Sequence, residues 1–68
     1  MTFDLSIIVP LFNEEDNVGP MYEAIHAAVR DLPGRIEIVF VDDGSRDHTF
    51  ATACRLPHDQ GNTHLRLV

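Results

Sequence analysis

Two nearly unbroken apolar runs, LSIIVPLF at residues 5–12 and IEIVFV at residues 36–41, constrain the fold of this chain more than any other feature. Both runs are rich in β-branched residues, and neither alternates strictly between apolar and polar positions. Continuous apolar strands are typical of parallel sheets, whose two faces are both covered. We therefore predict strands at about residues 5–9 and 36–41. The first should end near Val9, because Pro10 lacks the N–H that a sheet ladder uses.

The segment between these strands predicts a helix over about residues 18–32. Its apolar residues recur at spacings of three and four and form one stripe. Pro20 suits a first helical turn, where a missing N–H costs nothing, and the Pro33-Gly34 pair should end the helix.

A second, shorter helix is predicted at about residues 46–55, with Ser45 as its N-cap and Pro57 just beyond its end. The polar linker HDQGNT follows, and HLRLV predicts a third strand at about residues 64–68. The order is therefore βαβαβ, an α/β fold with a parallel sheet, because crossovers of this length join parallel strands.

The handedness of the crossovers predicts which face of the sheet is covered. Two right-handed crossovers between strands laid side by side place both helices on one face. The strands nevertheless offer apolar side chains to both faces. We expect further protein on the bare face, so that residues 1–68 form part of a larger domain.

Composition excludes several classes of function. The chain has 68 residues, a formal charge of −6, five arginines and no lysine, so a nucleic-acid-binding surface and lysine chemistry are not expected. Cys54 is the sole cysteine and is expected to be a small buried apolar residue, which suits a reducing compartment. No apolar stretch approaches the ~20 residues of a membrane span, and the N-terminus lacks a signal-peptide pattern. These features predict a cytoplasmic protein.

Acidic clusters follow both long strands. The first cluster is Asn13 to Asp16, and the second is the Asp42-Asp43 pair. Parallel neighbours would bring both clusters to one edge, where open α/β sheets bind ligands. Carboxylates there can accept hydrogen bonds from a nucleobase N–H or from ribose hydroxyls. Asp-Gly-Ser is also ordinary turn-and-cap chemistry, so the residues alone leave a ligand site and a structural turn as alternatives.

SIIVPLFNEEDN together with EIVFVDDGSRDHT resembles the start of family 2 glycosyltransferases with the GT-A fold. Within that family the polyprenyl-phosphate sugar transferases, which use dolichol or undecaprenyl phosphate, are the members it resembles most. The resemblance covers about residues 5–50. It implies that residues 1–68 are the nucleotide-binding, Rossmann-like part of a nucleotide-diphospho-sugar transferase domain that is incomplete here.

The resemblance also implies functional residues. Pro10, Leu11, Phe12 and Glu14 would line the nucleoside pocket, Asp43 would accept the nucleobase N–H, and Asp42 would shape the loop. The full-length relative would transfer a sugar from a UDP- or GDP-sugar to an acceptor, such as a polyprenyl phosphate, by inverting displacement. It would act at the cytoplasmic face of a membrane and touch that membrane only through parts absent here.

The family's metal-binding Asp-x-Asp motif and its catalytic base lie further downstream than this chain reaches. The resemblance therefore implies a divalent metal, Mg²⁺ or Mn²⁺, in the full-length family that this chain does not hold alone. No catalytic residue is expected within it, and the isolated chain is expected to be inactive.

Three other readings remain. A non-catalytic nucleotide-binding or interaction module could self-associate through the uncovered sheet face. A phosphoacceptor receiver domain fits less well, because its acidic pair follows the first strand and its site needs a lysine. A zinc site is disfavoured, because the four histidines and one cysteine lack paired spacing.

Overall fold

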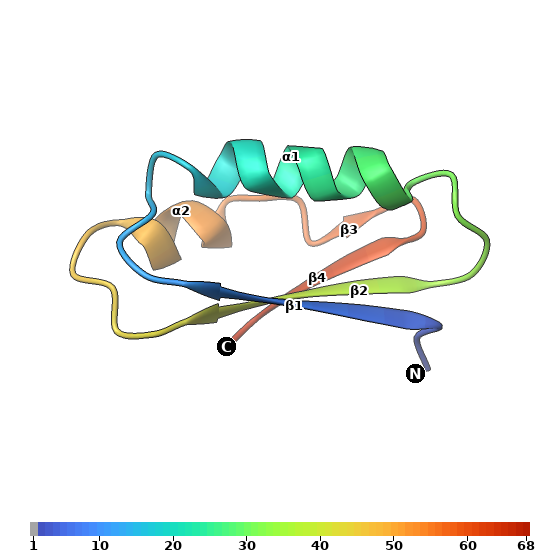
Figure 1. Cartoon of the computed structure of the whole chain (residues 1–68), viewed down its shortest axis with the longest axis horizontal. Helices are drawn as coiled ribbons and strands as arrows, with labels where there is room; N and C mark the ends of the chain where they lie inside the picture. The colour runs from blue at the N-terminus through green and yellow to red at the C-terminus, as the bar shows by residue number, and fades with distance from the viewer. Residues whose placement is uncertain (1) are drawn as a thin grey trace.

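The computed structural model describes residues 2–68, which form a four-stranded sheet covered by two helices. The elements follow in the order β1 (Leu5–Leu11), α1 (Val18–Val29), β2 (Ile36–Asp42), α2 (Thr49–Cys54), β3 (Asp59–Gln60) and β4 (Thr63–Leu67). Both helices lie on the same face of the sheet (Figure 1), as the handedness of the crossovers predicts.

The sheet has the strand order β1-β2-β4-β3, and its three longer strands are parallel. The register sets Ile7 opposite Ile38 and Ile38 opposite Leu65. The α/β prediction is confirmed, but the sheet is mixed rather than purely parallel. Residues 59–60, which the sequence predicted as linker, pair antiparallel with β4 across a turn at Gly61, whose φ is +62°.

Strand β1 was predicted to end near Val9, but it continues through Pro10 to Leu11. The Leu11 carbonyl accepts the Asp43 N–H at 2.9 Å, so the backbone groups of Leu11 face β2. Those of its neighbour Pro10 then face the free edge of the sheet, because successive residues of a strand point their backbone groups to opposite sides. No ladder donor is missing, since β1 is an edge strand.

Both helices are shorter than predicted. Helix α1 ends at Val29 rather than near residue 32, and the Asn62 side-chain amide donates to the carbonyls of Val29 and Leu32 at 3.1 and 3.0 Å. That side chain satisfies C-terminal carbonyls that would otherwise lack partners. Helix α2 begins at Thr49 rather than near residue 46, because the side chains of the preceding turn make other bonds, described below.

The core lies between the helices and the covered face of the sheet. Its fully buried members come from both helices and from all three long strands: Leu11, Val18, Tyr22, Ile38, Phe40, Ala53 and Leu65. The Tyr22 hydroxyl lies 3.0 Å from the Pro57 carbonyl and 3.2 Å from Gln60 Oε1. Helix α1 is thereby tied to the segment that leads into β4.

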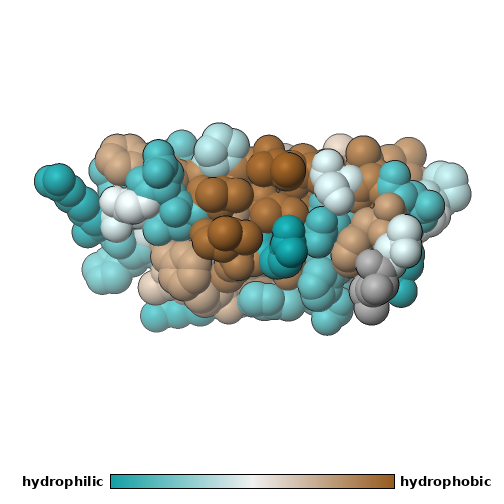
Figure 2. All heavy atoms as spheres, turned by 90° about the horizontal axis from the view of Figure 1, so that it is seen from below, coloured by the Kyte–Doolittle hydropathy of each residue, from teal (hydrophilic) through white to brown (hydrophobic). Residues whose placement is uncertain are grey.

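The other face of the sheet, which we call the open sheet face, carries no helix (Figure 1). An apolar patch surrounded by polar side chains is visible on it (Figure 2). Strand alternation assigns Ile8, Pro10, Val39 and Val41 to this face, and Ile8 is 67% exposed. The sequence predicted such a bare apolar face, and apolar area of this kind is ordinarily covered in a complete parallel sheet.

Candidate functional site

Two loops meet at the carboxyl ends of β1 and β2. The first acidic loop, residues 12–17, joins β1 to α1, and the second acidic loop, residues 43–48, joins β2 to α2. Leu11 pairs with Asp42 in the parallel register, so both loops leave the sheet at one edge. The two loops thus lie at the same end of the sheet, as predicted (Figure 1).

Four hydrogen bonds between backbone and side chains join these loops, and we call this set the loop interlock. Three successive backbone N–H groups of the first acidic loop each donate to a side chain beyond β2. The bonds are Asn13 N–H to Ser45 Oγ at 3.0 Å, Glu14 N–H to Thr49 Oγ1 at 2.7 Å, Glu15 N–H to Asp47 Oδ2 at 3.3 Å and, in return, Arg46 N–H to Asn13 Oδ1 at 2.8 Å.

The two adjacent aspartates differ in what they contact. Asp42 is half-buried, and its Oδ1 accepts a hydrogen bond from the Ser45 hydroxyl. Asp43 is exposed, and its N–H is tied to the Leu11 carbonyl. The Asp43 carboxylate has no hydrogen-bond or ion-pair partner among residues 2–68. One carboxylate therefore supports the turn, while the other is an open acceptor.

The remaining predicted site residues occupy different environments. Phe12 is 54% exposed, and Glu14 is half-buried in the first acidic loop beside the interlock. Leu11 is only 1% exposed and packs in the core, so only its backbone can face a ligand. Pro10 is exposed on the open sheet face, two residues before the first acidic loop. Phe12, Glu14 and Asp43 are thus the predicted side chains accessible on the loops themselves.

Sequence reasoning missed the roles of Asn13 and Thr49. Asn13 has a φ of +51°, in the left-handed region that asparagine tolerates better than most residues. Thr49 is fully buried, and its hydroxyl and N–H both donate to Asp47 Oδ1. The Asp-x-Thr spacing is a recognisable local side-chain-to-backbone pattern that could have indicated this turn.

Ser45 was predicted to cap the second helix, and this is wrong. Its hydroxyl instead bridges Asp42 and the Asn13 N–H, and α2 starts four residues later. The carboxylate that serves the helix start is Asp47, which accepts the Thr49 N–H at 3.0 Å. Hydrogen bonds, the strongest from the Thr49 hydroxyl, hold the pKa of Asp47 below its usual range, although partial desolvation opposes them.

The acidic side chains do not converge as metal ligands do. No cluster of three histidine, cysteine, aspartate or glutamate side chains suited to a metal ion occurs within the described part of the chain. The two acidic loops supply single carboxylates that contact the turn, backbone amides or His48, or that face outward, so they do not fit a metal ion. Cys54, expected to be buried, is exposed at the end of α2.

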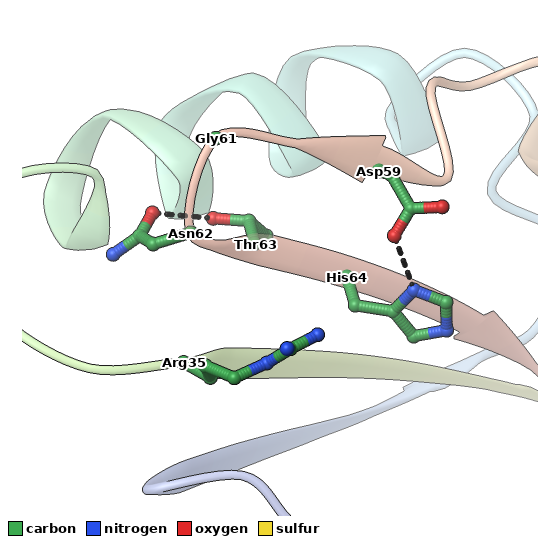
Figure 3. Close-up of a pocket in the computed structure, with 6 residues that line it drawn as sticks. All are labelled: Arg35, Asp59, Gly61, Asn62, Thr63 and His64. Atoms are coloured by element: carbon green, nitrogen blue, oxygen red, sulfur yellow. Dashed lines mark hydrogen bonds and ion pairs between the residues drawn. The ribbon is translucent and has the colours of Figure 1, made fainter. Parts of the chain in front are cut away.

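A cavity of about 190 Å³ lies at the opposite end of the parallel strands from the acidic loops, beside the β3–β4 hairpin (Figure 3). Arg35, Asp59 and His64 contribute side chains to its lining, and His64 Nδ1 lies 2.7 Å from Asp59 Oδ1. This is the amino end of the parallel strands, whereas ligands of open α/β sheets bind at the carboxyl ends. The acidic loops, not this cavity, are therefore the candidate site.

None of the described helices is long and apolar enough to span a lipid bilayer. No solved structure matched the chain.

Comparison with curated proteins gave consistent matches. The chain is 48% identical over 67 residues to the dodecaprenyl-phosphate galacturonate synthase of Rhizobium johnstonii, a match that covers 98% of this chain and 20% of that protein. It is 44% identical over 45 residues to the undecaprenyl-phosphate 4-deoxy-4-formamido-L-arabinose transferase of Pseudomonas fluorescens, covering 66% of this chain and 13% of that protein. A bactoprenol glucosyl transferase of Shigella phage SfV is 40% identical over 45 residues, covering 66% and 15%.

This chain thus spans about a fifth or less of the length of these relatives. The family model described as "Glycosyl transferase family 2" matches residues 6–67, which include both acidic loops and every strand but the first residue of β1. The chain therefore belongs to glycosyl transferase family 2.

Proposed function

We propose that this chain is the nucleotide-sugar-binding segment of a glycosyltransferase. The observation that carries the proposal is the Asp43 carboxylate, an exposed acceptor held beside a second loop at the carboxyl end of a parallel sheet. A carboxylate in this position can accept the imide N–H of uracil or the N–H groups of guanine. UDP- and GDP-sugars are therefore the donors to test.

The proposed roles of the other residues follow from their exposure. Phe12 offers an exposed ring that can stack on the base, and Glu14 lies on the same loop. Leu11 and Pro10 form the strand end beneath that loop, Leu11 through its backbone alone. Asp42 holds the turn through Ser45, so that Asp43 faces outward.

The reaction proposed for the full-length protein is transfer of the sugar to a polyprenyl phosphate with inversion at the anomeric carbon. An acceptor phosphate oxygen would form the new bond to that carbon while the bond to the departing nucleoside diphosphate breaks. The names of the relatives, which specify dodecaprenyl phosphate, undecaprenyl phosphate and bactoprenol, support this acceptor class.

The chemical step needs groups that this chain does not supply. Departure of a diphosphate calls for neutralisation of its charge, usually by a metal ion. The acidic loops do not fit a metal, so we assign a Mg²⁺ or Mn²⁺ site, and the base that activates the acceptor, to protein outside residues 1–68. The isolated chain is accordingly proposed to bind nucleotide without catalysing transfer, and the full-length protein to act at the cytoplasmic face of a membrane.

Calorimetric titration of the chain with UDP and with GDP tests the binding role. Loss of one hydrogen bond to a charged acceptor costs about 1.5–3 kcal/mol, so Asp43→Ala should weaken binding by about 10- to 100-fold. Asp31→Ala is the matched control, because Asp31 is an exposed aspartate beyond the far end of α1. Equal affinity of Asp43→Ala and the parent would refute the base-acceptor role.

The open sheet face supports a second candidate, an interaction module that self-associates. The large apolar side chains that a second copy would bury are Ile8 and Val68, which are 67% and 61% exposed. Sedimentation velocity over a concentration series distinguishes the two, because self-association would raise the sedimentation coefficient with concentration. A concentration-independent monomer that binds nucleotide would contradict the interaction module.

A further inference from the structure

We infer that the loop interlock is a positioning device for the nucleotide site, with Thr49 and Asn13 as its principal positioning residues. The inference rests on the proposed nucleotide-binding role of Asp43 and extends it to residues that do not themselves touch the nucleotide.

The interlock joins segments that have no secondary structure of their own. Residues 12–17 and 43–48 form turns and bends, so no helix or sheet ladder fixes one loop against the other. The N–H groups of three consecutive residues, 13 to 15, are satisfied by two side chains of the second acidic loop and by Thr49, the first residue of α2. Such side chains replace the partners that regular structure would have provided.

Thr49 anchors the interlock to the core. It is fully buried at the first position of α2, and its hydroxyl accepts the Glu14 N–H at 2.7 Å while donating to Asp47. That bond is the shortest of the four between the loops. The Thr49 hydroxyl therefore fixes the position of the first acidic loop relative to the start of α2.

Asn13 completes the connection from the opposite side. Its N–H donates to Ser45 Oγ, and its side-chain oxygen accepts the Arg46 N–H at 2.8 Å. Asn13 makes this reciprocal pair at a φ of +51°. Asp43 lies between two fixed points, its own N–H on Leu11 and the Asn13–Ser45 bond two residues later.

The consequence for binding is preorganisation. The Asp43 carboxylate is exposed, but the backbone that carries it is held on both sides, so less ordering is needed when a nucleotide binds. Without the interlock, the distance between Asp43 and the ring of Phe12 would vary, and part of the binding free energy would be lost to ordering both loops.

The first test compares Thr49→Val with Thr49→Ser and with Thr52→Val. Valine matches threonine in shape but lacks the hydroxyl, and serine keeps the hydroxyl. Thr52, also in α2, has no side-chain hydrogen bond among those described and serves as a control for loss of a hydroxyl. We expect Thr49→Val to weaken UDP or GDP binding about tenfold and to speed amide hydrogen exchange at residues 13–15 and 43–47. Thr49→Ser and Thr52→Val should stay close to the parent in both measurements.

Asn13→Gly is a second route to the same result, should the buried Thr49→Val variant fail to fold. Glycine tolerates the positive φ and removes the whole side chain, including the Oδ1 that accepts the Arg46 N–H. Asn13→Gly should weaken binding several-fold and speed exchange at Arg46, while Asn13→Asp, which keeps an acceptor oxygen, should bind more tightly than Asn13→Gly.

The outcomes separate the two proposals. A parent that binds nucleotide, with Thr49→Val or Asn13→Gly binding equally well, overturns the positioning role and leaves the proposed function standing. Unchanged exchange in the second acidic loop also overturns the positioning role, whether or not nucleotide binds. A parent that binds neither UDP nor GDP overturns the proposed function and this inference with it.

Discussion

Substitution of Gly34 by alanine should destabilise the fold strongly through one identifiable contact. Gly34 has a φ of +94°, and an added Cβ would overlap the Asp4 carboxylate and lie 2.9 Å from Asp4 Cγ. The carboxylate cannot turn aside freely, because its Oδ2 accepts the Arg35 N–H at 2.8 Å. The backbone of Asp4 is fixed as well, since its N–H donates to the Arg35 carbonyl at 2.8 Å.

The magnitude follows from two costs. A non-glycine residue in a left-handed conformation costs about 1–2 kcal/mol, and loss of the charged hydrogen bond costs about 1.5–3 kcal/mol. Because Asp4 is exposed, we take the lower part of each range and expect a loss of about 3 kcal/mol. Domains of this size have free energies of unfolding of about 3–10 kcal/mol, so the loss is a large fraction of the total.

Gly44→Ala is the matched control. Gly44 also has a positive φ, +72°, but an added Cβ there would meet no atom within 4 Å. Its cost should be the backbone strain alone, about 1–2 kcal/mol. Since Gly44 follows Asp43, this variant should also weaken nucleotide binding, whereas Gly34→Ala, at the opposite edge of the sheet, should not affect the affinity of the folded protein.

Urea denaturation followed by circular dichroism measures both losses if the slopes agree among variants. A double-mutant cycle with Asp4→Ala isolates the contact, because the cost of Gly34→Ala should fall to about that of Gly44→Ala once the carboxylate is gone. If Gly34→Ala costs no more than Gly44→Ala, or if removal of the Asp4 carboxylate leaves its cost unchanged, the contact with Asp4 is not the cause of the loss.

Two further predictions concern pH. The hydrogen bond from the Thr49 hydroxyl is the largest cause of the lowered pKa of Asp47 in the folded protein. The ionised Asp47 carboxylate therefore stabilises the fold above the unfolded pKa of about 3.9, and this contribution is lost as pH falls through the folded pKa. Urea midpoints of Asp47→Asn should fall less steeply in acid than those of the parent, and parallel curves would contradict this. Burial, and secondarily Glu23, raise the pKa of Tyr22, so its contribution is present below about pH 10 and is lost as pH rises through the folded pKa. Tyr22→Phe should cost about 1 kcal/mol at neutral pH, because the Pro57 carbonyl and Gln60 lose a donor, and should flatten the alkaline limb of the stability profile; an equal alkaline decline would refute this.

The parallel part of the fold could be predicted because its signals are long. The apolar runs around Ile7 and Ile38 and the stripe that includes Val18 and Val29 each extend over several residues with one periodicity. Strand β3 has no such signal, since Asp59 and Gln60 are polar, exposed and only two residues long. Its pairing depends on the turn at Gly61 and on contacts distant in sequence, such as the Tyr22 hydroxyl with Gln60.

The candidate site was predictable at the level of its loops but not of its hydrogen bonds. The strand ends place Asp42 and Asp43 at the edge of the sheet, and parallel pairing brings the first acidic loop beside them. Ser45 could satisfy either its own helix or a partner more than thirty residues away, and local propensity favoured the nearer choice. The bonds of Thr49 to Asp47 are local and follow a recognisable spacing, but its bond to the Glu14 N–H could not be predicted, because Glu14 is distant in sequence.

A nucleotide titration followed residue by residue in ¹H–¹⁵N NMR spectra tests most directly whether the two acidic loops form one binding site. We predict that UDP or GDP shifts the amide signals of residues 11–16 and 42–47 together, with one common affinity. Shifts confined to one loop, or gathered around residues 59–64 at the other edge of the sheet, would contradict it.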